Sequence, residues 1–216
     1  MTYKVVEIFT SIEGEGKRAG QPAVFVRLHG CNLSCTYCDT TYAMTGEYET
    51  MHLDSIMDKL SATHIKRVTL TGGEPLDTPG VDVLIEKMLS GGFEVNVETN
   101  GSVDISPYLP YENLFFTIDY KLPSSGVCEK MHLANFPLLR PCDVLKFVVG
   151  NEHDAQHMLE FVRQLASNPQ IYIGAVFGSY HPQDLVTFIL DKPELTDAKI
   201  QLQLHKYIWN PSERGV

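Results

Sequence analysis

Short apolar runs alternate with segments of helical periodicity along most of the chain. The runs at 23–28, 67–71, 93–101, 114–121, 143–149, 171–176 and 200–204 are rich in β-branched and aromatic residues, which favours strands. Between several of these runs, apolar residues recur at helical spacing, at 53–60, 81–89, 155–162 and 185–189. Because strands that alternate with helices pair side by side through right-handed crossovers, the pattern predicts a parallel sheet.

The length of the chain limits how far such a sheet can close. A barrel of eight strand and helix units needs about 250 residues, and this chain has 216. We therefore predict an α/β fold, a shortened, open (βα) barrel with mostly parallel strands, formed by one domain over residues 1–216. The segment 102–113 contains Pro107 and Pro110 and has no helical period, so we expect no full helix there.

Polar residues follow the predicted strands, where parallel barrels carry their working residues. Arg27 precedes a cysteine-rich loop, a Thr-Gly-Gly-Glu stretch ends the strand at 67–71, and polar residues end the next strands. The strand order predicts that these groups meet at one rim, which comprises Arg27, the 31–38 loop, residues 71–74, Glu98, Thr99, residues 119–121 and His205.

Cys31, Cys35 and Cys38 have the spacing C-x-x-x-C-x-x-C. Glycine, asparagine, serine, threonine and aspartate surround them and disfavour a helix, so the stretch predicts a loop that wraps a bound centre. A structural zinc ion needs four ligands, and His29 or Asp39 would have to supply the fourth. A 4Fe-4S cluster held by three thiolates keeps one iron open for an outside ligand. The count of ligands leaves both alternatives open.

Three further features are candidates for ligand binding. In Glu13-Gly14-Glu15-Gly16, the glycines allow close approach of the backbone and the carboxylates accept hydrogen bonds, although an acidic surface turn would look the same. Arg27 interrupts an apolar strand, which suits either a substrate carboxylate or a structural ion pair. The pair Gly72-Gly73 at a strand end would expose backbone groups to a ligand.

Composition and charge narrow the possible partners. With 17 basic residues against 27 acidic ones, the formal charge is −10 and no basic block occurs, which disfavours nucleic acid. We find no apolar run of membrane length and no signal-peptide pattern, so we expect a cytoplasmic protein without a membrane partner. Cys128 and Cys142 are isolated, which predicts free thiols and no disulfide framework.

The cysteine spacing, with Tyr37 before the last cysteine, resembles that of the radical S-adenosylmethionine (SAM) superfamily, in which SAM chelates the open iron of the cluster. Four segments, Glu13 to Gly16, Arg27 to Asn32, Gly72 to Pro75 and Leu204 to Trp209, extend the likeness almost end to end. Together they resemble the 7-carboxy-7-deazaguanine synthase family.

The resemblance implies a radical SAM carbon-nitrogen lyase with a shortened barrel. Such an enzyme converts 6-carboxy-5,6,7,8-tetrahydropterin to 7-carboxy-7-deazaguanine and ammonia in queuosine precursor biosynthesis. It uses a 4Fe-4S cluster, SAM and Mg²⁺, takes electrons from a flavodoxin-type or other reductant, and forms a homodimer. The 5'-deoxyadenosyl radical is the reactive species, so we assign no catalytic side chain.

The resemblance also implies roles for individual residues. Cys31, Cys35 and Cys38 would ligate the cluster, and Thr40 would reach Mg²⁺. The residues expected to bind SAM are Tyr37, Cys38, Asp39, Gly73, Glu74, Thr99, Asp119, Tyr120 and Lys121. Those expected to bind the pterin are Ile12, Glu13, Gly14, Arg27, Thr71 and His205.

The chain departs from the family pattern at two places: Glu13 stands where the family commonly has glutamine, and Asp119-Tyr120-Lys121 where many relatives have Ser-Pro-Lys. Two other functions compete with a synthase. A radical SAM activase that makes a glycyl radical on a partner enzyme shares the cysteine spacing. A zinc-stabilised or electron-transfer binding protein would use the same cysteines without turnover.

Overall fold

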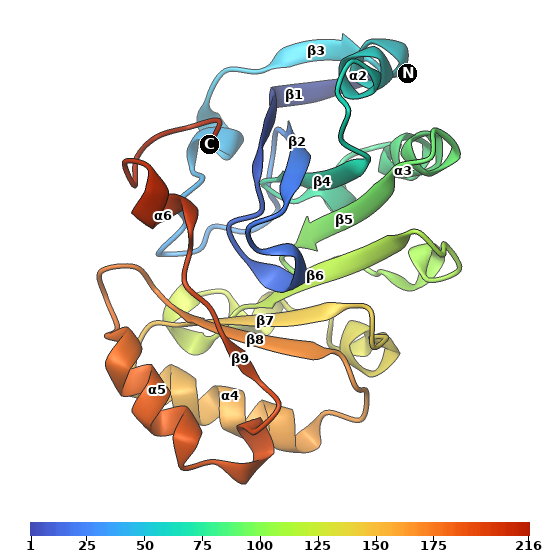
Figure 1. The fold of residues 1–216 in the computed structure, drawn as a ribbon. Helices are drawn as coiled ribbons and strands as arrows, with labels where there is room; N and C mark the ends of the chain where they lie inside the picture. Colours follow the sequence, from blue (N-terminus) through green and yellow to red (C-terminus); the bar gives the residue numbers. More distant parts are fainter.

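The computed structural model describes all 216 residues and contains one nine-stranded sheet in the order β3-β1-β2-β4-β5-β6-β7-β8-β9. Neighbouring strands from β2 to β9 are parallel, whereas β1 is antiparallel to β2 and to β3. The sheet curves but its edges do not pair, which confirms the predicted open barrel (Figure 1). The strands are β1 Thr2–Ile12, β2 Pro22–Leu28, β3 Glu49–His52, β4 Arg67–Gly72, β5 Glu94–Thr99, β6 Leu114–Tyr120, β7 Val144–Val149, β8 Gln170–Ala175 and β9 Lys199–Ile200.

Four helices cover the sheet as the apolar spacing predicts: α2 Leu53–Ser61, α3 Val81–Ser90, α4 Glu152–Gln164 and α5 Pro182–Leu190. Each buries one apolar face, as α3 does with Val81, Leu84, Ile85 and Met88. Two short helices, α1 Tyr42–Thr45 and α6 His205–Ile208, flank the site described below. None of these helices is both long enough and apolar enough to span a bilayer.

Two crossovers lack an α-helix. The connection between β5 and β6 has only the 3-10 turn η3 Ser106–Tyr108, as expected. The connection between β6 and β7 consists of η4 Pro123–Ser125, η5 Cys128–Lys130 and η6 Leu133–Leu138. Aromatic rings fill part of the space that a helix would occupy, because the Tyr120 ring packs 5.2 Å from the Phe136 ring and 4.2 Å from the Phe161 ring, measured between centroids.

The structure differs from the predicted elements at both sheet edges. The first eleven-residue strand pairs antiparallel with β2, and β3 has only Met51 buried, so neither resembles an apolar parallel strand. The predicted strand at 200–204 shrinks to β9, because residues beyond Ile200 leave the sheet and run toward α6. The sheet is therefore parallel only from β2 onward.

The two faces of the sheet differ in polarity. On β4, Val68 and Leu70 are buried in the apolar core, whereas Thr69 and Thr71 alternate with them and point to the opposite, concave side. The same alternation puts Asn96, Glu98, Thr117, Asp119 and Lys146 on that side. The concave face thus carries polar and charged groups that can contact a ligand.

The loop from Glu13 to Gln21 closes one end of the barrel. It joins β1 to β2 at the ends where the parallel strands begin, and it contains the 3-10 turn η1 Gly16–Arg18. Arg18 pairs with Glu94 at the start of β5, and Lys17 Nζ donates to the carbonyl of Cys142 at 2.9 Å. The loop is therefore fixed across several strands, which excludes the alternative of an acidic surface turn.

Candidate active site

A cavity of about 810 Å³ lies on the concave side of the sheet, between the cysteine loop, the Glu13–Gly16 loop and α6. Most of the predicted site residues line it: Ile12, Glu13, Gly14, Arg27, Cys31, Cys35, Tyr37, Cys38, Asp39, Thr40, Thr71, Gly73, Thr99, Asp119, Lys121 and His205. Glu74 and Tyr120 do not. Apart from Glu74 and Tyr120, the groups that the strand order places at one rim therefore meet in a single cavity.

The three cysteines lie on a loop, as predicted, and the loop is anchored from both sides. Gly30 N donates to the carbonyl of Ala43 at 2.9 Å, and Thr36 N donates to the carbonyl of Ser125 at 3.0 Å. Cys31 Sγ accepts from Leu33 N at 3.5 Å and from Asn100 Nδ2 at 3.7 Å. Such contacts to sulfur are among those that tune iron-sulfur clusters.

The three thiols belong to residues that line the same cavity. In a cluster, each thiolate would bind a different iron. Burial raises the pKa of the Cys31 and Cys35 thiols, so a bound metal would have to displace their protons. Cys128 and Cys142 are free, as predicted.

Gly72 and Gly73 both line the cavity, and the amides of Gly73 and Glu74 are bonded within the chain. Gly73 N donates to the carbonyl of Leu28 at 3.3 Å, and Glu74 N donates to the carbonyl of Gly30 at 2.8 Å. The glycine pair therefore brings the end of β4 against the end of β2 and the start of the cysteine loop. The second glycine, which a simple turn would not need, is required by this close approach.

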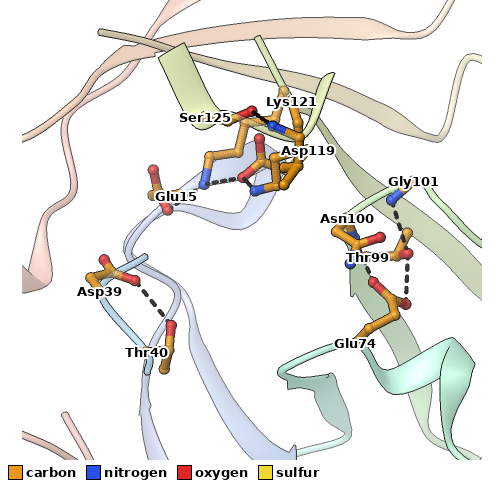
Figure 2. A network of polar contacts seen from close by, with 12 residues as sticks. Glu15, Asp39, Thr40, Glu74, Thr99, Asn100, Gly101, Asp119, Lys121 and Ser125 are labelled. Atoms are coloured by element: carbon orange, nitrogen blue, oxygen red, sulfur yellow. Dashed lines mark hydrogen bonds and ion pairs between the residues drawn. The ribbon is translucent and has the colours of Figure 1, made fainter. Parts of the chain in front are cut away.

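Glu74 holds two strand ends together beneath the cavity. Only 1% of the residue is exposed, and its carboxylate accepts from Leu76 N at 3.0 Å, Thr99 Oγ1 at 2.8 Å and Asn100 N at 2.7 Å (Figure 2). Burial raises the pKa of Glu74 to about 7, against the effect of these three donors. Its side chain therefore supports the wall that contains Thr99.

Tyr120 points to the other side of the sheet. It alternates with Asp119 and Lys121, whose side chains line the cavity, and its hydroxyl lies 3.3 Å from His157 Nε2 on α4. Its ring belongs to the aromatic cluster under α4. The side chain of Tyr120 cannot make the predicted SAM contact, which leaves its backbone atoms for that role.

Two lysines and two carboxylates form the charged wall of the cavity. Lys146 Nζ lies 2.7 Å from Glu15 Oε2 and 3.9 Å from Asp119 Oδ2. Asp119 Oδ2 also pairs with Lys121 at 2.9 Å (Figure 2). Burial alone would lower the pKa of Lys146, but Glu15 and Asp119 raise it above its usual range. Sequence analysis missed Lys146 as a site residue, although it is a lone charge within an apolar strand, as Arg27 is.

Two polar atoms in the cavity wall have no partner in the protein. The Tyr37 hydroxyl and Asp119 Oδ1 are both buried and make no hydrogen bond. A buried polar atom without a partner costs free energy, so such atoms in a cavity are suited to a ligand. Both belong to residues that were predicted to bind SAM, and their position fits a ligand that carries hydrogen-bonding groups.

Glu13 lies at the floor of the cavity with little exposure to solvent. Its carboxyl accepts from the Thr69 hydroxyl and has Asn96 beside it. Burial and then the nearby Glu98 raise the pKa of Glu13 to about 8, and burial also raises the pKa of Glu98. Near neutral pH this floor therefore holds a protonated carboxyl group.

Arg27 makes an ion pair at one side of the cavity. Its Nε lies 2.7 Å from Glu7 Oε1, which also accepts from the Tyr42 hydroxyl at 3.0 Å. The structural ion pair that the sequence left open therefore exists. The remaining nitrogens of Arg27 make no hydrogen bond, so they are available to a ligand in the cavity.

Asp39 and Thr40 form a cluster of oxygen atoms after the last cysteine. The Thr40 hydroxyl donates to Asp39 Oδ1 at 3.0 Å (Figure 2). Lys206 Nζ lies 2.9 Å from Asp39 Oδ2. Burial would raise the pKa of Asp39, but Lys206 and Thr40 bring it down to about 2. The cavity therefore keeps an ionised carboxylate beside the predicted magnesium ligand.

His205 explains why residue 14 is a glycine. A Cβ at Gly14 would collide with the imidazole of His205, so the ring packs directly on the backbone of the loop. Burial lowers the pKa of His205, which keeps the imidazole neutral. The α6 segment thus presents a neutral ring to the cavity opposite the cysteine loop.

Comparison with known proteins agrees with this arrangement. Residues 25–116 match the model of the Radical SAM superfamily. The structure resembles the crystal structure of QueE from Escherichia coli, with a TM-score of 0.73 over 94% of both chains at 20% identity. It also resembles Streptococcus suis SuiB bound to its precursor peptide SuiA, with a TM-score of 0.60 over 82% of this chain and 48% of that one at 10% identity. The open parallel barrel and the three-cysteine loop thus define a radical SAM enzyme.

Curated relatives show which family of radical SAM enzymes the chain belongs to. A 7-carboxy-7-deazaguanine synthase from Clostridium acetobutylicum is 43% identical over the full length of both chains. Another from Chlorobaculum tepidum is 39% identical over 98% of this chain and 96% of the relative. The chain belongs to the 7-carboxy-7-deazaguanine synthase family, as the sequence motifs indicated. It is therefore a radical SAM lyase, and the family implies a 4Fe-4S cluster and SAM as cofactors.

Proposed function

We propose that the chain is a 7-carboxy-7-deazaguanine synthase of queuosine precursor biosynthesis. The reaction contracts the ring of 6-carboxy-5,6,7,8-tetrahydropterin to 7-carboxy-7-deazaguanine and releases ammonia. One observation carries the proposal: a single cavity joins the three-cysteine loop to a floor of buried carboxyl groups and a wall that contains Arg27. That combination suits a flat, nitrogen-rich ligand with a carboxylate, held beside a cluster.

Cys31, Cys35 and Cys38 are the residues that would hold the cluster. SAM would lie against the loop at Tyr37 to Asp39, with Gly73, Thr99, Asp119 and Lys121 around it, and with contacts from Glu74 and Tyr120 limited to backbone atoms. When bound, cluster and SAM supply reductive cleavage that generates a carbon radical for hydrogen abstraction. The unpartnered Tyr37 hydroxyl and Asp119 Oδ1 support this placement.

The chain itself binds and orients the pterin. Ile12, Glu13 and Gly14 form the floor, Thr71 and Arg27 the side, and His205 the opposite wall. Protonated Glu13 donates a hydrogen bond, whereas Glu98 accepts one when ionised, so the floor offers both kinds of partner to the ring edge. No side chain is assigned as a general base, because the chain's contribution is position and exclusion of water.

Magnesium would bind at Thr40, next to the substrate carboxylate. The Thr40 hydroxyl and the ionised Asp39 supply oxygen atoms, which this cation prefers. There the cation would neutralise charge on the substrate and fix its orientation. We further propose a homodimer that receives electrons from a flavodoxin-type or other reductant, by analogy with the family.

The function is tested by anaerobic incubation of reconstituted protein with SAM, dithionite, Mg²⁺ and the carboxylated tetrahydropterin, followed by mass spectrometry for the deazapurine. Wild type should form the deazapurine with release of ammonia. Cys35→Ala should lose both SAM cleavage and product, whereas Cys142→Ala, which removes an exposed thiol outside the cavity, should retain both. Reductive SAM cleavage by wild type without any deazapurine would refute the proposed substrate.

A further inference from the structure

We infer that Arg214 joins Arg27 in a two-guanidinium subsite for the carboxylate of the bound pterin. The inference deepens the proposed function and rests on it. Both side chains border the same cavity, although their residues are 187 positions apart in the chain. Arg214 is therefore a positioning and specificity residue that the sequence motifs do not reveal.

The two guanidinium groups meet at one aromatic ring. Arg214 Cζ lies 3.9 Å from the centroid of the Tyr42 ring, and Arg27 Cζ lies 5.7 Å from it. Tyr42 belongs to α1, directly after the cysteine loop. Stacking on an aromatic face holds a guanidinium in place while its N–H groups remain free to bind an anion.

One of the two guanidinium groups, that of Arg214, has no ion-pair partner in the protein. Glu7 neutralises Arg27 at 2.7 Å, but no carboxylate lies within 4.0 Å of the Arg214 guanidinium. Glu213 also lines the cavity and makes no ion pair. Although Glu213 adds a negative charge to the cavity, the Arg214 guanidinium itself stays unpaired and is open to a ligand carboxylate.

A turn sets the position of Arg214. Asn210 Oδ1 accepts from Ser212 N at 3.0 Å and from Ser212 Oγ at 2.7 Å, and Glu213 N donates to the carbonyl of Asn210 at 2.8 Å. The chain then passes from α6 to the region of α1, where the C-terminal end lies in Figure 1. The segment 211–216 thus borders the cavity and carries Arg214 to the side of Arg27.

The neighbouring wall suits the flat ring that would bear the carboxylate. Phe9 and Phe25 stack with their centroids 4.9 Å apart and their planes 6° from parallel, and both border the cavity. Phe25 lies two residues before Arg27, so both side chains project from the same face of β2. The subsite therefore suits a heterocycle that packs on an aromatic wall and carries a carboxylate substituent.

The test compares two ligands on wild type and on Arg214→Gln: the carboxylated tetrahydropterin and the same tetrahydropterin without the carboxylate. Calorimetric titration of the holoenzyme with SAM measures each Kd. Loss of a charge-assisted contact should weaken binding of the carboxylated ligand roughly tenfold and leave the other ligand within twofold. Arg214→Lys should recover part of the loss, and Arg163→Gln, on the outer helix α4, should bind both ligands as wild type does.

The outcomes separate this inference from the proposed function. An equal loss for both ligands would show that Arg214 only holds the segment in place, and an unchanged Kd for both would also overturn the inference. If wild type forms the deazapurine in either of these cases, the proposed function still stands. If wild type forms no deazapurine but Arg214→Gln loses the preference for the carboxylate, the subsite stands and the proposed reaction fails.

Discussion

Gly73 lies directly against Gly30, which links the end of β4 to the start of the cysteine loop. A Cβ at residue 73 would overlap the carbonyl oxygen of Gly30 and would lie 2.6 Å from Cβ of Cys31. The backbone bond from Glu74 N to that same carbonyl, at 2.8 Å, keeps the contact in register. Cys31, the first of the proposed cluster ligands, is therefore positioned by a contact between two residues without side chains.

We expect Gly73→Ala to displace the cysteine loop. The added methyl group meets backbone atoms that cannot rotate away, so the protein should lose about 1–3 kcal/mol of stability, the usual cost of overpacking. The iron content after anaerobic reconstitution should also fall. Gly174→Ala is the matched control, because its Cβ would meet Gln201 O at an ordinary 3.4 Å. A Gly73→Ala protein with full iron content and wild-type Tm would contradict the positioning role.

Glu13 should make stability depend on pH. The pKa of Glu13 is about 8 in the folded state, whereas an unfolded glutamate titrates near 4.5. Between these values the folded protein keeps the proton and the unfolded chain has lost it, so the free energy of unfolding falls as pH rises. Glu13→Gln keeps the shape and removes this titration. The free energy of unfolding of Glu13→Gln minus that of wild type should therefore increase between pH 5 and pH 8. The increase should exceed about 1.4 kcal/mol, which corresponds to one pKa unit.

Chemical denaturation at both pH values measures this difference. Glu47→Gln is the control, because Glu47 is exposed and its substitution should shift stability equally at both pH values. If the Glu13→Gln difference from wild type were the same at pH 5 and pH 8, Glu13 would not be protonated in the folded protein.

Lys146 should be important for stability because it neutralises Glu15 on the cavity wall. Their side chains are only 12% and 16% exposed. Lys146→Met leaves Glu15 without its cation and should cost about 3 kcal/mol, as the loss of one partner of a buried pair does. Glu15→Gln in the same protein should recover part of this loss. A double-mutant cycle from denaturation curves measures the coupling, and additive effects would show that the pair contributes nothing.

The parallel core of the fold was predictable because its signal is local. Each of β4 to β8 shows either a run or an alternation of apolar residues, and the buried residues of α2 to α5 recur at helical spacing. The antiparallel edge was not predictable in this way. In β3, Met51 is the only buried residue, so its pairing with β1 depends on contacts between strands rather than on its own sequence.

The location of the candidate site was easier to predict from the sequence than the contacts that its side chains make. Strand order brings Arg27, Cys31, Asp119 and His205 to one cavity, because parallel strands end at the same edge. Side-chain direction was the harder part. Tyr120 points away because side chains alternate along β6 and its neighbours Asp119 and Lys121 face the cavity.

Residues on distant segments escaped sequence analysis for a different reason. Lys146 and Arg214 carry no motif, and their importance comes from which charges surround them in the folded chain. Glu74 was expected to bind SAM because the family resemblance implies that contact. Its three internal donors, which only the tertiary structure supplies, explain why that carboxylate is buried instead.

Thr40 should determine the affinity for the divalent cation. Its hydroxyl lies 3.0 Å from Asp39 Oδ1, whose carboxyl stays ionised because Lys206 brings its pKa down to about 2. Thr40→Ala removes one oxygen ligand and should raise the Mg²⁺ concentration needed for half-maximal turnover roughly tenfold. Thr40→Ser keeps the hydroxyl and should stay near wild type. Thr41→Ala is the control, because the Thr41 side chain makes no hydrogen bond and only its carbonyl accepts, from Met44 and Thr45. Mn²⁺ titration followed by electron paramagnetic resonance, with SAM and the pterin bound, measures cation binding without turnover. Equal Mn²⁺ affinity in wild type and Thr40→Ala would show that the cation binds elsewhere.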